Sequence, residues 1–255
     1  GTLRPHTAGQ TLQNLTTIHV STNGAVIDCS LADYTVSQNL THDPALANAA
    51  DGGLLKRGAN TLNLTGTGNT FTGPVRVETG LLRARLGGTN DLFVAPGAAF
   101  DALAQRCEVG DLAGYGPLTN GVIAVHGRLN VGTNGAPAGA AMSVQNLTLA
   151  IGSTFVCDWT TNALGHVVND TVAVSGALSV EGAGFVDLGR TADNPIRMPF
   201  TATVMTYGSF AGSFTGWKAV NTGLPPQTPT ALRITAANNV VTLQVNYGGT
   251  LILLK

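Results

Sequence analysis

The chain has 255 residues, 33 of them glycine, and a formal net charge of −1. Charged residues make up 11% of the chain, against roughly 25% in an average soluble domain, and apolar residues make up 44%. This balance excludes a disordered tail, and the absence of a basic cluster in the sequence leads us to expect no nucleic-acid partner.

Short apolar alternations closed by Gly, Asn or Pro recur along the chain and predict strands of about three to six residues. The clearest are Thr61–Leu64, Val75–Val77, Val122–Val125, Leu147–Leu149, Val172–Val174 and Val240–Val245. A weak amphipathic pattern at Phe100–Arg106 is the one candidate helix. Short loops are expected at Asp101–Gly116, Gly132–Gly139 and Asn221–Pro229.

The same cadence of strand and glycine turn repeats along the sequence. Residues 53–66 and 72–84 each place an apolar-x-apolar strand beside a turn, and residues 144–155 and 172–185 follow the same pattern. Repetition of this kind indicates a solenoid, in which each coil pairs with the next at about 4.8 Å. We therefore predict an all-β fold: one β-solenoid domain over residues 1–255, with about ten coils of roughly 22 to 25 residues around stacks of Leu, Val, Ile and Phe.

Residues 52–84 resemble the autotransporter-associated β-strand repeat, also called the passenger-associated transport repeat. The matching residues are Gly52, Leu54, Lys56, Gly58, Thr61, Leu62, Leu64, Gly66, Asn69, Thr70, Thr72, Gly73, Val77, Gly80 and Leu82. Phe71 stands for the usual aromatic, Asn60 and Pro74 replace usual glycines, and Thr67-Gly68 fills a slot that usually holds one residue. Segments 23–28, 127–132, 146–155 and 170–180 look like neighbouring coils, and residues 206–217 resemble the closing segment of a C-terminal region of about 200–255.

This resemblance implies a right-handed, single-stranded parallel β-helix from the passenger region of an exported protein. It also implies processing from a precursor and an extracellular location at the cell surface. It brings no catalytic residues with it. The longest apolar runs are shorter than the roughly 18 residues of a membrane-spanning helix, so we expect no membrane span.

Three cysteines, Cys29, Cys107 and Cys157, are too few and too scattered for a disulfide framework, although the sequence leaves one pair open. We expect buried thiols that act as small apolar fillers. Alternation places Cys29 on one face with Ile27 and Leu31. It places Cys157 on one face with Phe155 and Trp159.

The ionisable residues show no catalytic or metal-binding spacing, so we expect no enzyme, no cofactor and no metal site. The acids are isolated, Gly-x-Ser-x-Gly does not occur, and the five histidines lack paired spacing. Adjacent coils could still bring distant acids together, which leaves a polysaccharide-degrading β-helix enzyme as a remote alternative.

Two functions remain. The first is a structural, self-associating surface protein: a fibre, matrix or layer subunit, or the stalk of a passenger. The second is an adhesin or glycan-binding module that recognises cell-surface or matrix glycans. A binding module favours clustered exposed aromatics, whereas Trp217, Tyr34, Tyr115, Tyr207 and Tyr247 are dispersed in the sequence.

The end of the sequence carries the candidate self-association residues, Leu251, Ile252, Leu253 and Leu254. This contiguous apolar run is strand-forming, and its exposure to water is unfavourable. It either pairs along the last coil of its own chain or adds as a strand to a neighbouring subunit. Repeated head to tail, the second arrangement builds a homo-oligomer or filament.

Overall fold

The structure is a computed structural model that describes residues 1–7, 9–12, 14–87, 90–132, 138–164, 166–189, 200–221 and 230–247. The first strands are β1 (Thr2–Leu3), β2 (Gln10–Leu12), β3 (Ile18–Val20), β4 (Ala25–Asp28), β5 (Tyr34–Val36), β6 (Leu40–His42), β7 (Leu54–Arg57), β8 (Thr61–Leu64), β9 (Val75–Val77), β10 (Gly80–Ala84), β11 (Asn90–Val94) and β12 (Ala98–Gly114). They are followed by β13 (Leu118–Val125), β14 (Arg128–Val131), β15 (Ala141–Leu149), β16 (Thr154–Val156), β17 (Trp159–Thr161), β18 (Val167–Asn169), β19 (Thr171–Val180), β20 (Phe185–Asp187), β21 (Phe200–Gly212), β22 (Lys218–Asn221), β23 (Thr230–Ala237) and β24 (Val240–Tyr247). One 3-10 helix, η1 (Pro44–Leu46), lies in the loop after β6.

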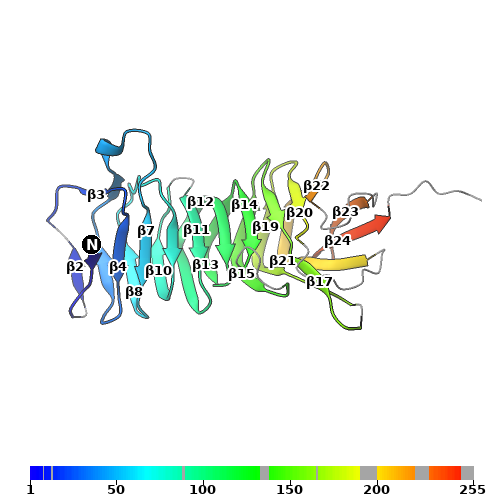
Figure 1. The fold of residues 1–255 in the computed structure, drawn as a ribbon, viewed down its shortest axis with the longest axis horizontal. Coiled ribbons are helices and arrows are strands. Elements are labelled where there is room, and N and C mark those ends of the chain that lie inside the picture. The colour runs from blue at the N-terminus through cyan, green and yellow to red at the C-terminus, as the bar shows by residue number, and fades with distance from the viewer. Residues whose placement is uncertain are drawn as a thin grey trace, which may run out of the picture.

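Strands far apart in the sequence lie side by side in an elongated, solenoid-like stack (Figure 1). Twenty strands share one hydrogen-bonded system, in which most pairs are parallel. A strand pairs with its equivalent in the previous coil and again in the next, as β9 does with β7 and β11. The all-β, repetitive architecture expected from the sequence is confirmed at this level.

Apolar side chains form continuous columns through the stack, as the alternating patterns predict. In one of these columns each residue pairs with the equivalent residue of the next coil. Its members are Leu54, Val75, Leu92, Leu112, Leu129, Phe155 and Val186. Every member is buried, because alternate side chains of a strand point to the same face and here that face is the interior. Stacking of equivalent positions thus turns a sequence alternation into a core.

Coil length varies more than the expected 22 to 25 residues. Val75 pairs with Leu92, 17 positions later, whereas Val172 pairs with Met205, 33 positions later. The paired strands stay aligned in the stack, and the segments that connect them differ in length. Coil length is therefore set by the turns and not by the strands.

The expected helix at Phe100–Arg106 and the expected loop at Asp101–Gly116 are both wrong, because β12 covers all of the first segment and the second as far as Gly114. Phe100 pairs with Leu82 on one side and Leu118 on the other, which holds the segment in the stack. Leu103 and Ala104 have φ angles of 55° and 57° and turn the strand through a corner. The expected loops at Gly132–Gly139 and Asn221–Pro229 fall largely outside the described residues.

Backbones of adjacent coils approach so closely at some turns that only glycine fits. Gly53 has a φ of 69°, in the left-handed region, and a Cβ on it would collide with the carbonyl oxygen of Pro74 in the next coil. Glycine at this position therefore serves both the turn and the stacking distance.

A buried carboxyl, Asp170, accepts hydrogen bonds from the backbone N–H groups of Gly139 and Ala140, each at 2.8 Å. Burial raises its pKa to about 6 in spite of these bonds. As the pH falls, the folded protein therefore takes up this proton before the unfolded chain does, and the folded state gains stability between about pH 6 and pH 4.

Replacing Asp170 with Asn removes the charge and keeps an oxygen that accepts the two N–H bonds. We expect the free energy of unfolding to rise by about 1–2 kcal/mol at pH 8, because an ionised buried carboxylate is disfavoured. The gain should vanish near pH 4, where Asp170 is already protonated when folded. Urea unfolding of both proteins at the two pH values measures this, and a gain that does not depend on pH contradicts it.

Candidate functional site

The N-terminal end of the stack leaves three strand edges open. β1 pairs with β4, β2 with β5 and β3 with β6, all in parallel. Among the strands that the structure describes, none lies on the other side of these three (Figure 1). Their outer N–H and C=O groups therefore offer a template for a further strand.

An apolar hollow with a volume of about 150 Å³ opens between these strands. It is lined by Gly1, Leu3, Leu12, Ile18, Ala25, Val26, Ile27, Val36 and Leu40. Leu3 is 37% exposed, and Leu12 and Ile18 are half-buried. The side-chain columns of the core thus reach this end without being covered.

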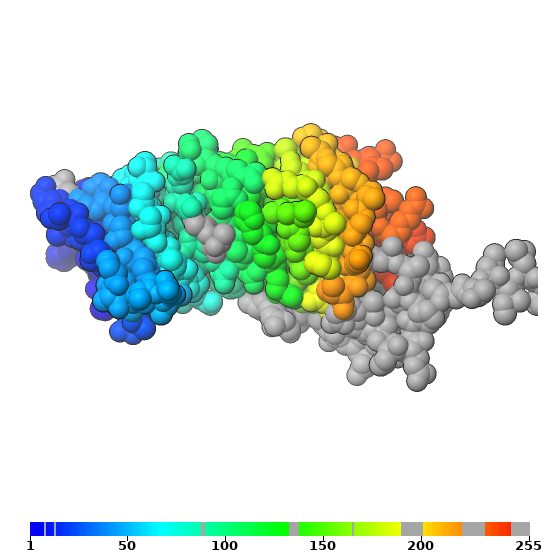
Figure 2. Space-filling model, turned by 90° about the horizontal axis from the view of Figure 1, so that it is seen from above, coloured from blue at the N-terminus to red at the C-terminus, as the bar shows by residue number. Residues whose placement is uncertain are grey.

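The C-terminal end is built differently. β24 runs antiparallel along β21, and β23 runs antiparallel along β24, so the direction of pairing reverses after the last parallel coil. Tyr207, Phe210, Phe214 and Trp217 form a chain of ring contacts with centroids 5.1 to 5.8 Å apart. The space among Phe214, Trp217, Ile234 and their neighbours is only about 10 Å³, so this end of the core is closed. In the space-filling view, β21 to β24 lie at the orange and red end, opposite the blue N-terminal coil (Figure 2).

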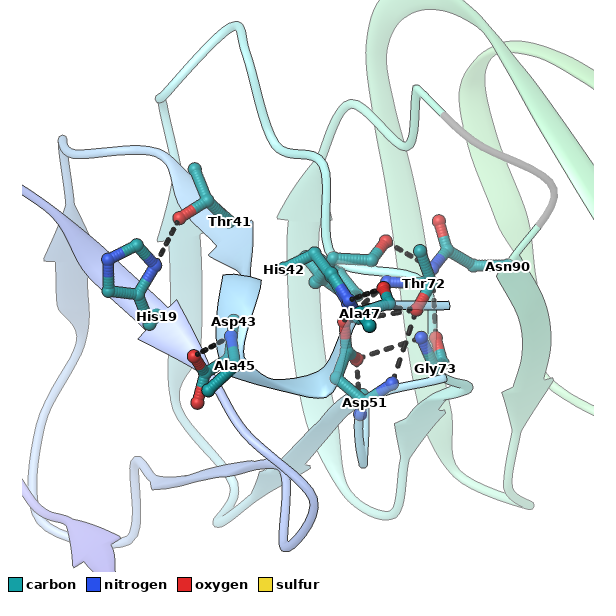
Figure 3. A network of polar contacts seen from close by, with 12 residues as sticks. His19, Thr41, His42, Asp43, Ala45, Ala47, Asp51, Thr72, Gly73 and Asn90 are labelled. Atoms are coloured by element: carbon teal, nitrogen blue, oxygen red, sulfur yellow. Dashed lines mark hydrogen bonds and ion pairs between the residues drawn. The ribbon is translucent and has the colours of Figure 1, made fainter. Parts of the chain in front are cut away.

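A polar cluster, which we call the His42 cluster, joins His42, Asp51 and Thr72 beside the loop that carries η1 (Figure 3). The fully buried carboxylate of Asp51 lies 3.0 Å from His42 Nδ1 and accepts the backbone N–H groups of Thr72 at 2.7 Å and Gly73 at 2.8 Å. It also accepts the N–H of Gly53 at 2.9 Å. The cluster therefore ties two coils to the base of the loop.

The surroundings of His42 favour its protonated form. Its Nδ1 faces the Asp51 carboxylate, and its Nε2 lies 3.1 Å from the carbonyl oxygen of Ala47. Both partners are acceptors, so a ring with a proton on each nitrogen satisfies both. The hydrogen bond to Asp51 raises the pKa of His42. Burial opposes ionisation of Asp51, but the hydrogen bonds from Thr72, His42, Gly73 and Gly53 outweigh it and lower its pKa to about 2.

The His42 cluster contains a hydroxyl, an imidazole and a carboxylate, yet its geometry is that of a structural clamp. Thr72 Oγ1 lies 3.3 Å from the same Nδ1 that contacts Asp51. A Ser-His-Asp relay needs the hydroxyl and the carboxylate on opposite ring nitrogens. Here the second nitrogen is held by the Ala47 carbonyl, so the cluster locks the loop.

A second buried charge, Lys56, lies on β7 in the same region, and its side chain reaches the turn that follows. Its side chain is fully buried, and Nζ donates to the carbonyl oxygens of Gly58, of Asn60 at 2.5 Å and of Thr79 at 2.7 Å. Burial lowers its pKa. Lys56 is one of the residues that match the repeat, but no role for it could be predicted. Its position two residues after Leu54 does indicate that its side chain points inward, because alternate side chains of a strand share a face.

Charged side chains also pair on the outside of the stack. Glu108 contacts Arg106 and His126, each at 2.6 Å, and Arg106 contacts Glu181 at 3.2 Å. Burial raises the pKa of Glu108, but its bonds to His126 and Arg106 outweigh this and lower it. Among the described residues, no group of three or more His, Cys, Asp or Glu side chains has an arrangement that could hold a metal ion.

A more open hollow of about 310 Å³, lined by both polar and apolar residues, lies on the side of the stack at a strand corner. It is lined by Leu118, Thr119, Asn120, Ser143, Val144, Gln145 and Ser175. The hydroxyls and amides are exposed, while Leu118 and Val144 form a buried apolar floor. Gln145 is held by a hydrogen bond from the N–H of Gly121 at 2.9 Å.

The structure places the singled-out residues as follows. All three cysteines are buried and free, which confirms the filler prediction, and burial raises the pKa of the Cys157 thiol. Ile27 and Trp159 point inward as expected, but Leu31 is 59% exposed, because the strand β4 ends at Asp28 and alternation stops there. Tyr34, Tyr207 and Trp217 are buried. The candidate self-association residues Leu251, Ile252, Leu253 and Leu254 lie outside the described residues.

Sequence reasoning did not identify Asp51, because an isolated acid carries no local signal of the partners it meets in other coils. Within the described part of the chain, no helix has the length and apolar character needed to cross a membrane. No protein-family model matches the sequence, and neither does any curated protein.

Proposed function

We propose that the chain is a non-catalytic structural protein of the cell surface that associates with copies of itself, as a subunit of a fibre, matrix or layer or as a passenger stalk. The observation that carries the proposal is the elongated stack of mostly parallel strands around a continuous apolar core, a body that grows along one axis (Figure 1). The low charge of the chain opposes association only weakly.

The proposal includes a right-handed parallel β-helix of the autotransporter passenger type, exported and processed from a precursor. It is supported by the position of residues 52–84, which form β7 to β10 in successive coils. Leu54, Leu62 and Leu82, three apolar positions of the resemblance, are buried in the core. The buried polar groups of the His42 cluster and Lys56 support a structural role, because their contacts hold turns in place.

Static light scattering over a concentration series, followed by electron microscopy of the purified chain, tests self-association. We expect the mean mass to grow with concentration beyond twice the 26.0 kDa of one chain, and elongated particles in the micrographs. A mass that stays at one chain over the whole series contradicts the proposal.

The polar hollow at Ser143 and Ser175 favours a second function, the binding of a cell-surface or matrix glycan. Exposed hydroxyls and amides over an apolar floor suit the mixed surface of a sugar. A glycan array should give hits on one related set of sugars. Ser143→Tyr, which fills the hollow, should remove them, and Ser209→Tyr, on an exposed position outside it, should not. An array without reproducible hits contradicts this function.

A further inference from the structure

We propose that the His42 cluster is a pH-sensitive switch, which holds the loop of residues 43–50 against the stack while His42 is charged and releases it when His42 loses its proton. The loop carries η1 and projects from the stack between β6 and β7 (Figure 1). The inference is independent of self-association, because it concerns a local opening within one chain.

The loop has few contacts with the rest of the molecule. Of residues 44–50, only Leu46 is half-buried, and the others are exposed. The backbone N–H groups that donate in this segment reach oxygens of residues 43–46, inside the loop itself. In the part of the chain that the structure describes, the bond from His42 Nε2 to the Ala47 carbonyl is the only hydrogen bond that joins residues 44–50 to the stack. This bond therefore decides whether the loop stays in place.

His42 can keep this bond without conflict only as the charged imidazolium. A neutral imidazole has one N–H group, whereas His42 faces the Asp51 carboxylate 3.0 Å from Nδ1 and the Ala47 carbonyl 3.1 Å from Nε2. The remaining proton stays on Nδ1, because a carboxylate is a stronger acceptor than a neutral carbonyl. A lone pair of Nε2 then faces the oxygen of Ala47, and two acceptors at this distance repel each other.

The backbone of Ala47 is held in a conformation from which it can relax. Its φ of 49° and ψ of −113° lie in a region that residues with a Cβ adopt only at a cost. In the docked loop, the hydrogen bond from His42 offsets this cost. Loss of the bond therefore removes the contact and the reason for the strained conformation at the same residue.

The acidic neighbours of His42 keep their charge while His42 titrates. Burial opposes ionisation of Asp51, but its hydrogen bonds lower its pKa to about 2, and the N–H of Ala45 lowers the pKa of Asp43. His19, on β3, is the other titratable neighbour and acts on Asp43. The hydrogen bond to Asp51 raises the pKa of His42 above 6.5, so the loop should be held at pH 6 and released as the pH rises through the folded value.

Limited proteolysis measures the release of the loop. Pancreatic elastase cleaves after small residues, and the loop contains Ala45, Ala47, Ala49 and Ala50. The cleavage rate of the protein is divided by that of a free peptide of residues 43–51 at the same pH, which corrects for the pH dependence of the protease. We expect this ratio to rise about tenfold from pH 6 to pH 9, the effect of losing one hydrogen bond to a charged group. Circular dichroism should show an unchanged stack over the same range.

Two variants identify the group that titrates. His42→Ala removes the bond at every pH, so it should be cut at pH 6 as fast as the parent is at pH 9. His19→Ala is the matched control, at an exposed histidine in the same region, and should keep the profile of the parent. A parent ratio that does not change with pH overturns the switch, as does a pH dependence that persists in His42→Ala or disappears in His19→Ala. The profile of the parent remains decisive even if His42→Ala fails to fold.

Discussion

Replacing Lys56 with Met is expected to lower the free energy of unfolding by about 2–3 kcal/mol, because buried carbonyl oxygens lose their donor. The ammonium group is buried and donates to the carbonyl oxygens of Gly58, Asn60 and Thr79. A buried ion pair can often be replaced by apolar groups when both partners change. Here the partners are backbone carbonyls, which stay in place and lose their donor.

Arg57→Met is the matched control for Lys56→Met. Arg57 is the next residue, carries the same charge and has a side chain that is 51% exposed, where it pairs with Glu78 at 2.9 Å. Exposed pairs contribute about 0–1 kcal/mol, so this change should have little effect. Urea unfolding followed by circular dichroism measures both variants. Equal losses for the two substitutions would show that burial of Lys56 contributes nothing.

Asp51→Asn is expected to destabilise the protein by about 2–3 kcal/mol at pH 5 and to loosen the loop that carries η1. The substitution keeps one oxygen for Gly53 and Gly73, but it turns an NH₂ group toward the N–H of Thr72 and the ring of His42. A donor then faces donors in a buried site, which is more costly than a missing bond.

The difference between the parent and Asp51→Asn should depend on pH in a defined way. Asp51 has a folded pKa of about 2, below the 3.8 of the unfolded chain, so its contribution is complete above pH 4 and is lost as the pH falls toward 2. His42 has a raised pKa, so its contribution is complete below about pH 6.5 and is lost as the pH rises through the folded value. The variant should therefore approach the parent as the pH falls toward 2. As the pH rises through the folded pKa of His42, the difference should shrink only by the share that His42 contributes, because ionised Asp51 still accepts the backbone N–H groups.

Unfolding curves of both proteins from pH 2 to pH 9, with Asp91→Asn as the control at an exposed carboxylate, measure this profile. Asp91 accepts one hydrogen bond, from the N–H of Asp111 at 2.8 Å, so its replacement should cost less than about 1 kcal/mol. A loss for Asp51→Asn that is the same at every pH would mean that its charge and that of His42 play no part.

The sequence by itself determined the strands, their inward faces and the role of the cysteines. The alternation at Thr61–Leu64 and Val75–Val77 indicates which side of each strand is apolar. A regular stack of coils then buries that side. Cys29 and Cys157 could be assigned to the core because apolar neighbours alternate with them. These properties depend on residues close together in the chain, so the local pattern is enough.

Only the tertiary structure decided which strands meet and what the polar groups do. Coils of 16 to 33 residues pair in register because the turns between strands differ in length, and no local pattern fixes that length. Phe100–Arg106 looks helical alone and becomes a strand because coils on both sides pair with it. His42 and Thr72, which are 30 residues apart in the sequence, come into contact beside Asp51. Lys56 donates to carbonyl oxygens of two different turns.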